Sequence, residues 1–435
     1  MIPLRHPARE KFFHCVEKML GFFHGVENPG RTQARLRAVR APPATAMKIG
    51  IDLISFHTPS YYLDLRTLAE KRGVDPDKFV IGIGQERMAV VPPDQDIVTL
   101  AANAALPIVE KAGRENIELL IFATESGVDQ SKAAACFCHR LLGLPAACRC
   151  IEVKEACYGA TASLRMAAAM VAARPHTRAL ILAADIARYD LASPGEPTQG
   201  AGAVAMLVAT RPRVLALDPE TGFYTEDIMD FWRPNYREEA FVDGKYSTRM
   251  YLTTLIEAWN SYKAASGRGL ADHAHYCFHL PFTKIARKSF ERLCKADGIE
   301  LPPKPEIERL LDAGLLYNRQ TGNTYAACVY ESLCSLLDNA PAALDDQRLG
   351  LFSYGSGCMA EFFSGIVQRG HREHLFTDQH RAQLDTRVPV TYRQYEDIFN
   401  YGVPKDGADH VFAPYRGGPF RLAGIKDHKR RYEAK

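Results

Sequence analysis

The sequence predicts an α/β protein built from two similar sets of strands and helices. From Met47 onward, short apolar runs typical of strands alternate with Ala-rich stretches typical of helices, which is the pattern of sheets covered by helices. A second set begins near Val214 and repeats the order of the first without obvious sequence identity. A chain of 435 residues, 47% of them hydrophobic, is long enough to bury two such sets.

The first set extends from Met47 to residue 211. Its strands are expected where apolar or β-branched runs stand between turn residues, at 117–124, 150–153, 178–184 and 201–209. Helices are expected at about 131–142 and from Cys157 to about Val171, because good helix-forming residues predominate there.

The second set, residues 212–435, contains a helix expected to begin at Ser247, because serine caps helix N-termini. The apolar residues that would turn inward on this helix are Leu252, Leu255, Ile256 and Trp259. The later elements are strands at 275–279 and 350–354 and a helix at 324–337. Strands at corresponding places in the two sets lead into Glu125 and end at His279, so we expect both side chains at one central site.

Residues 1–46 are basic, with eight Lys or Arg and three Glu, whereas the rest of the chain is slightly acidic. The charge of the main part therefore gives no reason to expect nucleic acid as a partner. Apolar residues in the basic segment fit a surface amphipathic helix or a transit-like sequence, and Pro42 and Pro43 suggest a linker. We expect a flexible extension. No apolar run reaches the ~20 residues of a membrane span, so no membrane partner is expected.

The eleven cysteines indicate a reducing compartment. Their odd number, without a secretory signal, argues against a disulfide framework, and a cytoplasmic protein is expected. The pairs Cys136-x-Cys138 and Cys148-x-Cys150 lack the wider spacing common in zinc sites. No metal is expected.

Cys157 is the candidate nucleophile, because it follows a strand-like run and opens a helical stretch. A thiol at a helix N-terminus faces unpaired N–H groups and the positive end of the helix dipole, and both favour the thiolate. The position predicts a lowered pKa and amides able to stabilise an oxyanion on an attached acyl group. The simpler alternative is a small buried side chain of the core.

Four other features complete a possible site. Glu125 ends an apolar strand, where burial would raise its pKa and suit it to acid–base catalysis near neutrality. His279 also ends a strand, and Lys284 and Lys288 lie four residues apart on one helical face suited to phosphate. The turn Gly355-Ser-Gly357 could direct N–H groups at an anion. Taken singly, these could equally be a solvated glutamate, a structural histidine, a surface lysine pair and a plain turn.

Nine short motifs occur in order between Met47 and the C-terminus. They are Gly73-Val-Asp-Pro-Asp-Lys-Phe79, Ile81-Gly-Ile-Gly-Gln85, Ala123-Thr-Glu-Ser126, Glu155-Ala-Cys-Tyr158, Glu196-Pro-Thr-Gln-Gly-Ala-Gly202, Asp230-Phe-Trp-Arg-Pro234, Val242-Asp-Gly244, Phe278-His-Leu-Pro-Phe-Thr-Lys284 and Phe352-Ser-Tyr-Gly-Ser-Gly357. This set resembles the 3-hydroxy-3-methylglutaryl-CoA (HMG-CoA) synthase family of thiolase-like condensing enzymes, most closely its bacterial mevalonate-pathway branch. The resemblance covers about nine-tenths of the chain and leaves out residues 1–46.

The resemblance implies a thiolase-like fold, with two duplicated βαβαβαββ halves (47–211 and 212–435) in a five-layer α-β-α-β-α sandwich. It implies an acyltransferase of isoprenoid precursor synthesis that converts acetyl-CoA, acetoacetyl-CoA and water to HMG-CoA and CoA. Cys157 would carry the acetyl group. Glu125 would deprotonate the acetyl methyl group and protonate the new alkoxide, and His279 would anchor and polarise acetoacetyl-CoA.

The same resemblance implies binding and supporting residues. Lys284 and Lys288 match positions that meet CoA, Asn323 matches one that contacts the acetoacetyl group, and a backbone N–H near Ser356 is a candidate oxyanion donor. Further matching positions are Asp185, Tyr189, Thr198, Asp230 and Ser247. A homodimer is implied, and no cofactor is needed because the CoA thioesters are the substrates.

Three alternatives stay open. Relatives in polyketide β-branching act on β-ketoacyl groups carried by an acyl carrier protein. A ketoacyl synthase or thiolase would use a different base arrangement, and the Ala123-Thr-Glu-Ser126 motif argues against it. A non-catalytic protein of the same fold should have lost Cys157, Glu125 or His279, whereas all three are present.

Overall fold

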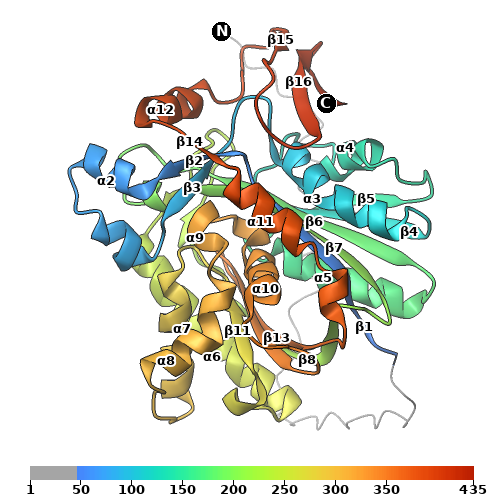
Figure 1. Ribbon diagram of the computed structural model, residues 1–435, viewed down its shortest axis with the longest axis vertical. Helices are drawn as coiled ribbons and strands as arrows, with labels where there is room; N and C mark the ends of the chain where they lie inside the picture. The colour runs from blue at the N-terminus through green and yellow to red at the C-terminus, as the bar shows by residue number, and fades with distance from the viewer. Residues whose placement is uncertain (1–46) are drawn as a thin grey trace, which may run out of the picture. The chain divides into compact units, whose positions relative to one another are not determined.

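Nine strands form one mixed sheet in residues 47–435, which are the residues that the computed structural model describes (Figure 1). The predicted flexible extension, 1–46, lies outside the described residues. The strand order is β11-β12-β13-β8-β1-β7-β6-β4-β5. Only two residue pairs, Gly50–Ala216 and Ile51–Leu215, join β1 to β8. The sheet therefore has a five-stranded part and a four-stranded part that meet at this short seam.

The five-stranded part belongs to the first half of the chain, in the order β-α-β-α-β-α-β-β. Its elements are β1 (Ile49–His57), α3 (Ile97–Ala112), β4 (Ile117–Ala123), α4 (Ala134–Leu141), β5 (Arg149–Val153), α5 (Gly159–Ala173), β6 (Arg178–Ala187) and β7 (Gly200–Thr210). Strand β4 is parallel to both β5 and β6, and β7 is antiparallel to β6 and β1. Each strand and helix predicted for this half is confirmed within a few residues.

The second half repeats this order with one strand fewer. Its elements are β8 (Leu215–Thr225), α6 (Gly244–Ser266), β11 (His275–Phe278), α7 (Lys284–Ala296), α8 (Lys304–Leu311), α9 (Asn318–Thr321), α10 (Cys328–Asn339), β12 (Arg348–Gly355) and β13 (Met359–Val367). Helices α8 and α9 stand where the first half has β5. The run Leu301-Pro-Pro-Lys-Pro305 explains this difference, because proline cannot donate to a sheet ladder.

The start of α6 differs from the prediction. The helix begins at Gly244, and its N-cap is Asp243, whose carboxylate accepts a hydrogen bond from the Tyr246 N–H at 3.0 Å. Ser247 lies inside the first turn, and its hydroxyl donates to Asp230 instead. Aspartate and serine are similar N-caps, so the sequence alone did not separate them.

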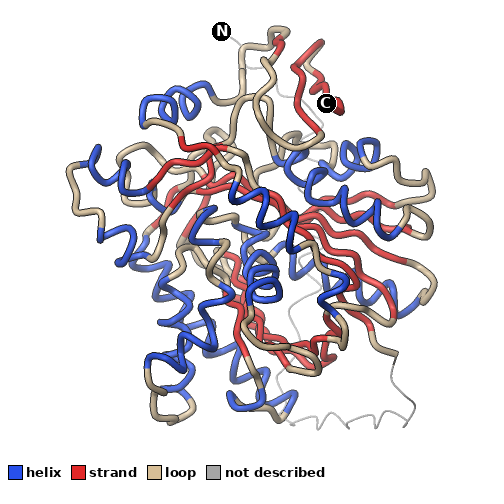
Figure 2. Tube along the Cα trace, viewed as in Figure 1, coloured by secondary structure: helices blue, strands red, loops and turns tan. Residues whose placement is uncertain are grey.

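Three buried clusters define five layers (Figure 2). Helices α5 and α10 share one cluster with residues of both parts of the sheet, so they form the middle layer. Helices α3 and α4 cover the outer face of the five-stranded part, and α6 and α7 cover the outer face of the four-stranded part. The α-β-α-β-α order of a thiolase-like fold is thereby confirmed, with apolar burial as its main driving force.

Smaller elements surround these layers. They are β2 (Tyr61–Asp64), α2 (Leu65–Arg72), a π-helical turn (Lys78–Ile83), β3 (Arg87–Val90), β9 (Phe231–Trp232), β10 (Phe241–Val242), α11 (Thr377–Asp385), β14 (Val388–Pro389), α12 (Tyr392–Tyr401), β15 (His410–Val411), β16 (Phe420–Lys426) and β17 (Lys429–Ala434). The β9–β10 hairpin matters for function because it passes beside Glu125. In residues 47–435, no helix has the length and apolar character needed to cross a membrane.

Candidate active site

Two predicted catalytic side chains meet at the carboxyl ends of neighbouring parallel strands. Glu125 follows β4, and Cys157 lies between β5 and α5. The Cys157 thiol donates a hydrogen bond to Glu125 Oε1 at 3.4 Å. Because β4 and β5 are paired in register, this contact is fixed by the sheet itself.

His279 approaches from the second half, directly after β11. Its neighbour Leu280 is tied to Cys328, whose thiol donates to the Leu280 carbonyl at 3.2 Å. Cys328 in turn is close enough to Cys157 to affect its pKa. Burial lowers the pKa of His279 to about 3, so the imidazole is neutral. Its Nδ1 is buried and has no hydrogen-bond partner among the described residues.

The Cys157 turn is tight and anchored from the second half. Ala156 has a φ of 40°, a left-handed conformation that is uncommon for a residue with a side chain. The Tyr158 hydroxyl donates to Glu361 of β13 at 2.6 Å. Gly355 at the end of β12 packs against the same turn, where a Cβ would lie 2.5 Å from the Glu155 carbonyl oxygen. Only glycine allows this approach.

The predicted low pKa of Cys157 is wrong. Burial raises the pKa of this thiol well above its usual value, and the nearby Glu125 and Asp185 carboxylates raise it further. Helix α5 begins two residues after Cys157, and only 7% of the cysteine is exposed. Desolvation and the nearby negative charges therefore affect the pKa of Cys157 more strongly than the helix dipole does. The resting site holds a protonated thiol that donates a hydrogen bond to the Glu125 carboxyl group.

The predicted high pKa of Glu125 is confirmed, at about 8. Burial is the largest cause, and the charge of Asp185 adds to it, whereas Arg233 and the Cys157 thiol act in the opposite direction. A carboxyl group that titrates near neutrality can both take and return a proton during one catalytic cycle.

Asp185 connects the two halves beneath Glu125. Its Oδ1 accepts hydrogen bonds from the Thr124 hydroxyl, the Glu125 N–H and the Ser126 hydroxyl at 2.8–2.9 Å. Its Oδ2 accepts the Ala326 N–H from the second half at 3.0 Å. This buried carboxylate fixes the Glu125 backbone, so the structure gives Asp185 a supporting contact.

Asp230 organises the turn that contains Ser356. Its carboxylate accepts the Ser247 and Tyr354 hydroxyls at 2.8 Å each and the Gly357 N–H at 3.0 Å. Asp230 is fully buried, and the turn between β12 and β13 presents Ser356 half-exposed. The structure thus brings Asp230, Ser247 and the Ser356 turn together.

We expect Asp230→Ala to destabilise the protein by about 2–4 kcal/mol, because three donors lose their acceptor. Thermal unfolding followed by circular dichroism measures this loss. Asp227→Ala is the matched control, because Asp227 is exposed three residues earlier. Equal unfolding midpoints for the two variants would contradict the anchoring role of Asp230.

Asn323 and Thr198 meet where the halves touch. The Asn323 N–H donates to the Thr198 carbonyl at 3.3 Å, and Asn323 Oδ1 accepts the Tyr325 N–H at 2.9 Å. Tyr189 is also buried in this region, and burial raises its pKa. The ring of Phe231 packs between Tyr189 and Tyr325, with centroid distances of 6.3 and 5.7 Å.

Sequence reasoning missed Glu331, which holds this loop. Glu331 accepts the hydroxyls of Thr321 and Thr324 at 2.6 and 2.8 Å, on either side of Asn323. Burial raises its pKa to about 7. A glutamate inside an otherwise apolar helix was the available signal, because such residues are seldom buried without a partner.

Lys284 and Lys288 occupy the first turn and a half of α7, five and nine residues after His279. Lys284 is half-buried and Lys288 is exposed. No contact joins either lysine to Cys157 or Glu125 among the described residues. Their place at the surface end of the His279 segment is compatible with a bound phosphate.

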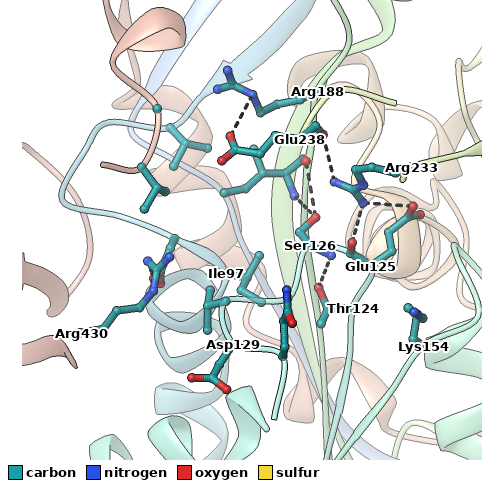
Figure 3. A pocket seen from close by; sticks show the side chains of 18 of the residues that line it. Ile97, Thr124, Glu125, Ser126, Asp129, Lys154, Arg188, Arg233, Glu238 and Arg430 are labelled. Carbon is teal, nitrogen blue, oxygen red and sulfur yellow. Dashed lines mark hydrogen bonds and ion pairs between the residues drawn. The ribbon is translucent and has the colours of Figure 1, made fainter. Parts of the chain in front are cut away.

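A cavity of about 1150 Å³ opens at Glu125 (Figure 3). Glu125, Ser126 and Ala156 line it from the first half, and Phe231 and Arg233 line it from the β9–β10 hairpin. Cys157 and His279 are not among its lining residues. Within residues 47–435, no cluster of three or more His, Cys, Asp or Glu side chains is arranged to hold a metal ion.

Comparison with known families identifies this arrangement. The family described as hydroxymethylglutaryl-coenzyme A synthase N terminal matches residues 45–212, and its C-terminal counterpart matches 215–312 and 299–402. The chain belongs to the hydroxymethylglutaryl-CoA synthase family. Members of this family are enzymes, so the non-catalytic alternative is set aside.

Individual proteins of known sequence or structure that resemble this chain belong to the same family. The chain is 48% identical to hydroxymethylglutaryl-CoA synthase of Enterococcus faecalis, over 81% of this chain and 92% of the relative. It is 35% identical to a polyketide biosynthesis 3-hydroxy-3-methylglutaryl-ACP synthase of Bacillus subtilis, over 80% of this chain and 87% of the relative. A solved HMG-CoA synthase complexed with CoA superimposes with a TM-score of 0.85 and 43% identity, over 89% of this chain and all of that structure.

Proposed function

We propose that this HMG-CoA synthase family member condenses acetyl-CoA, acetoacetyl-CoA and water to HMG-CoA and CoA, through an acetyl thioester on Cys157. The observation that carries the proposal is the 3.4 Å contact between the Cys157 thiol and Glu125, a carboxyl group whose pKa is about 8. A nucleophile and an acid–base group in direct contact are what covalent acyl transfer followed by proton abstraction requires.

In the first step the Cys157 sulfur attacks the acetyl carbonyl carbon of acetyl-CoA. The carbon–sulfur bond to CoA breaks, and the thiol proton of Cys157 ends on the departing CoA. The resting Cys157 thiol is protonated, and it gives up its proton as the sulfur attacks. The backbone N–H groups of Cys157 and of the Ser356 turn would stabilise the oxyanion.

In the second step Glu125 takes a proton from the methyl group of the acetyl thioester. The resulting carbon nucleophile attacks C3 of acetoacetyl-CoA, forms the new carbon–carbon bond and leaves an alkoxide that Glu125 protonates. The neutral His279 imidazole would donate a hydrogen bond to the acetoacetyl group. Asn323 would contact the same group.

In the last step water attacks the thioester on Cys157 and frees the carboxylate of HMG-CoA. The cysteine returns to the thiol. Lys284 and Lys288 would bind the phosphates of CoA, and Tyr189 and Thr198 would shape the acyl pocket beside Phe231. The cycle needs no group beyond the chain and its substrates.

Intact mass after incubation with acetyl-CoA alone tests the proposal. We expect one added acetyl group, located on Cys157 by digestion. It should disappear when acetoacetyl-CoA is added, with HMG-CoA formed. An acetyl group that persists until an acyl carrier protein is supplied would favour the polyketide reaction, which the 35% identical relative represents. No acetylation would contradict the proposed nucleophile.

We also propose a cytoplasmic homodimer. Strand β5 is the last strand of the sheet and pairs only with β4 among the described residues, so its outer edge could pair with a second copy. The ten cysteines in residues 47–435 are free thiols, which fits a reducing compartment. Light scattering after size-exclusion chromatography measures the assembly, and a mass near 48.4 kDa would contradict the dimer.

A further inference from the structure

Arg233 contacts Glu125 at two points. One guanidinium nitrogen donates to the Glu125 carbonyl oxygen at 2.5 Å and to the carboxylate Oε2 at 3.3 Å. The arginine side chain is 16% exposed and the glutamate side chain 7%, so the pair is largely shielded from water. Figure 3 shows both side chains at the wall of the cavity, with Arg233 directed at Glu125.

The β9–β10 hairpin holds Arg233 in this place. Asp230, just before β9, is fixed by the Ser247, Tyr354 and Gly357 donors described above. A second guanidinium nitrogen of Arg233 donates to the Glu238 carbonyl at 3.4 Å, across the hairpin. The hairpin therefore fixes the position of the Arg233 guanidinium, and with it the contact with Glu125.

The other titratable groups near Glu125 do not supply positive charge. Asp185 on β6, Cys157 before α5, Tyr189 after β6 and Tyr325 before α10 all act on Glu125 or are affected by it. Arg233 is the one cation paired with Glu125 among the described residues. Without it, a buried carboxylate would face a second carboxylate with no counter-charge.

We propose that Arg233 is a positioning residue that holds the Glu125 carboxylate in place and supplies its counter-charge during condensation. This inference rests on the proposed acid–base role of Glu125. Arg233 touches neither Cys157 nor His279 by any hydrogen bond among the described residues, so it acts through Glu125. It should therefore affect proton transfer more than acetyl transfer.

We expect Arg233→Gln to raise the pKa of Glu125 by about one unit, because an opposite charge at this distance favours the ionised form. Condensation at pH 7 should fall about tenfold and recover as the pH rises above 9, because the base form then returns. Arg233→Lys keeps the charge, so its pH profile should stay close to that of the wild type. HMG-CoA formation from pH 6 to 10 provides the measurement.

The matched control is Arg237→Gln on the same hairpin segment, because Arg237 pairs with Asp190 and Glu239 and not with Glu125. Its pH profile should be unchanged. A tenfold loss in Arg233→Gln that is equal at every pH would indicate a merely structural role and overturn the inference. So would a profile identical to that of the wild type.

Glu125→Ala, measured in parallel, separates this inference from the function on which it rests. If Glu125→Ala condenses normally, the acid–base role itself fails. If Glu125→Ala is inactive while Arg233→Gln keeps the wild-type profile, only the inference about Arg233 fails. Intact-mass measurement of acetyl-Cys157 in every variant confirms that the first half-reaction still occurs.

Discussion

Cys157→Ala is expected to form no acetyl-enzyme and to lose HMG-CoA synthesis almost completely, to a few per cent of wild-type activity or less. The proposed reaction requires a covalent bond between the acetyl group and a nucleophile. No other sulfur contacts Glu125 among the described residues, so no second thiol can replace Cys157. Intact mass after incubation with acetyl-CoA and the rate of HMG-CoA formation measure the two effects. Turnover clearly above a few per cent would contradict the assignment of the nucleophile.

The fold should survive this substitution. Cys157 belongs to a small buried cluster with Ala187 and Tyr325, and alanine removes only one sulfur atom from it. Circular dichroism should therefore match that of the wild type. Cys136→Ala is the control, because Cys136 is exposed on α4 and away from Glu125, and we expect it to keep full activity.

Glu125→Ala is expected to accept the acetyl group and then fail to condense it. General acid–base groups contribute about 10²–10⁴-fold to rates, so HMG-CoA formation should fall by at least that lower factor. Acetyl-Cys157 should accumulate and remain detectable after acetoacetyl-CoA is added. If the variant shows no acetyl-enzyme, Glu125 serves the first step and its proposed role must change.

The pH dependence of the wild-type enzyme follows from the same carboxyl group. Glu125 takes the methyl proton only when ionised, and its pKa is about 8. Condensation should therefore speed up as the pH rises through about 8 and level off above it, since a raised carboxyl pKa leaves most of the group protonated at pH 7. A rate that falls over this range would contradict Glu125 as the base.

Much of this site could be predicted from the sequence, because its signals are local. An apolar run that ends in Glu125 and a strand-like run that leads to Cys157 both place their side chains at strand ends, and parallel pairing of β4 with β5 brings those ends together. The raised pKa of Glu125 followed from the same apolar surroundings. The motif resemblance supplied the family, which the comparisons then confirmed.

The predictions that were wrong concern properties that depend on burial and on partners distant in the sequence. The position of Cys157 near a helix predicted a low pKa, but burial beside two carboxylates raises it. The N-cap of α6 is Asp243, and the Ser247 hydroxyl donates instead to Asp230, 17 residues away. The second half lacks one strand because the prolines of residues 301–305 cannot donate to a sheet ladder.

The sequence by itself predicted the layers, most of the order of the elements, and the candidate nucleophile and base. Only the tertiary structure decided their electrostatics. Arg233 pairs with Glu125 across 108 residues of chain, and Asp185 receives the Ala326 N–H across 141. Periodicity and turn residues report short-range preferences, whereas desolvation and ion pairing depend on which distant groups share a buried volume.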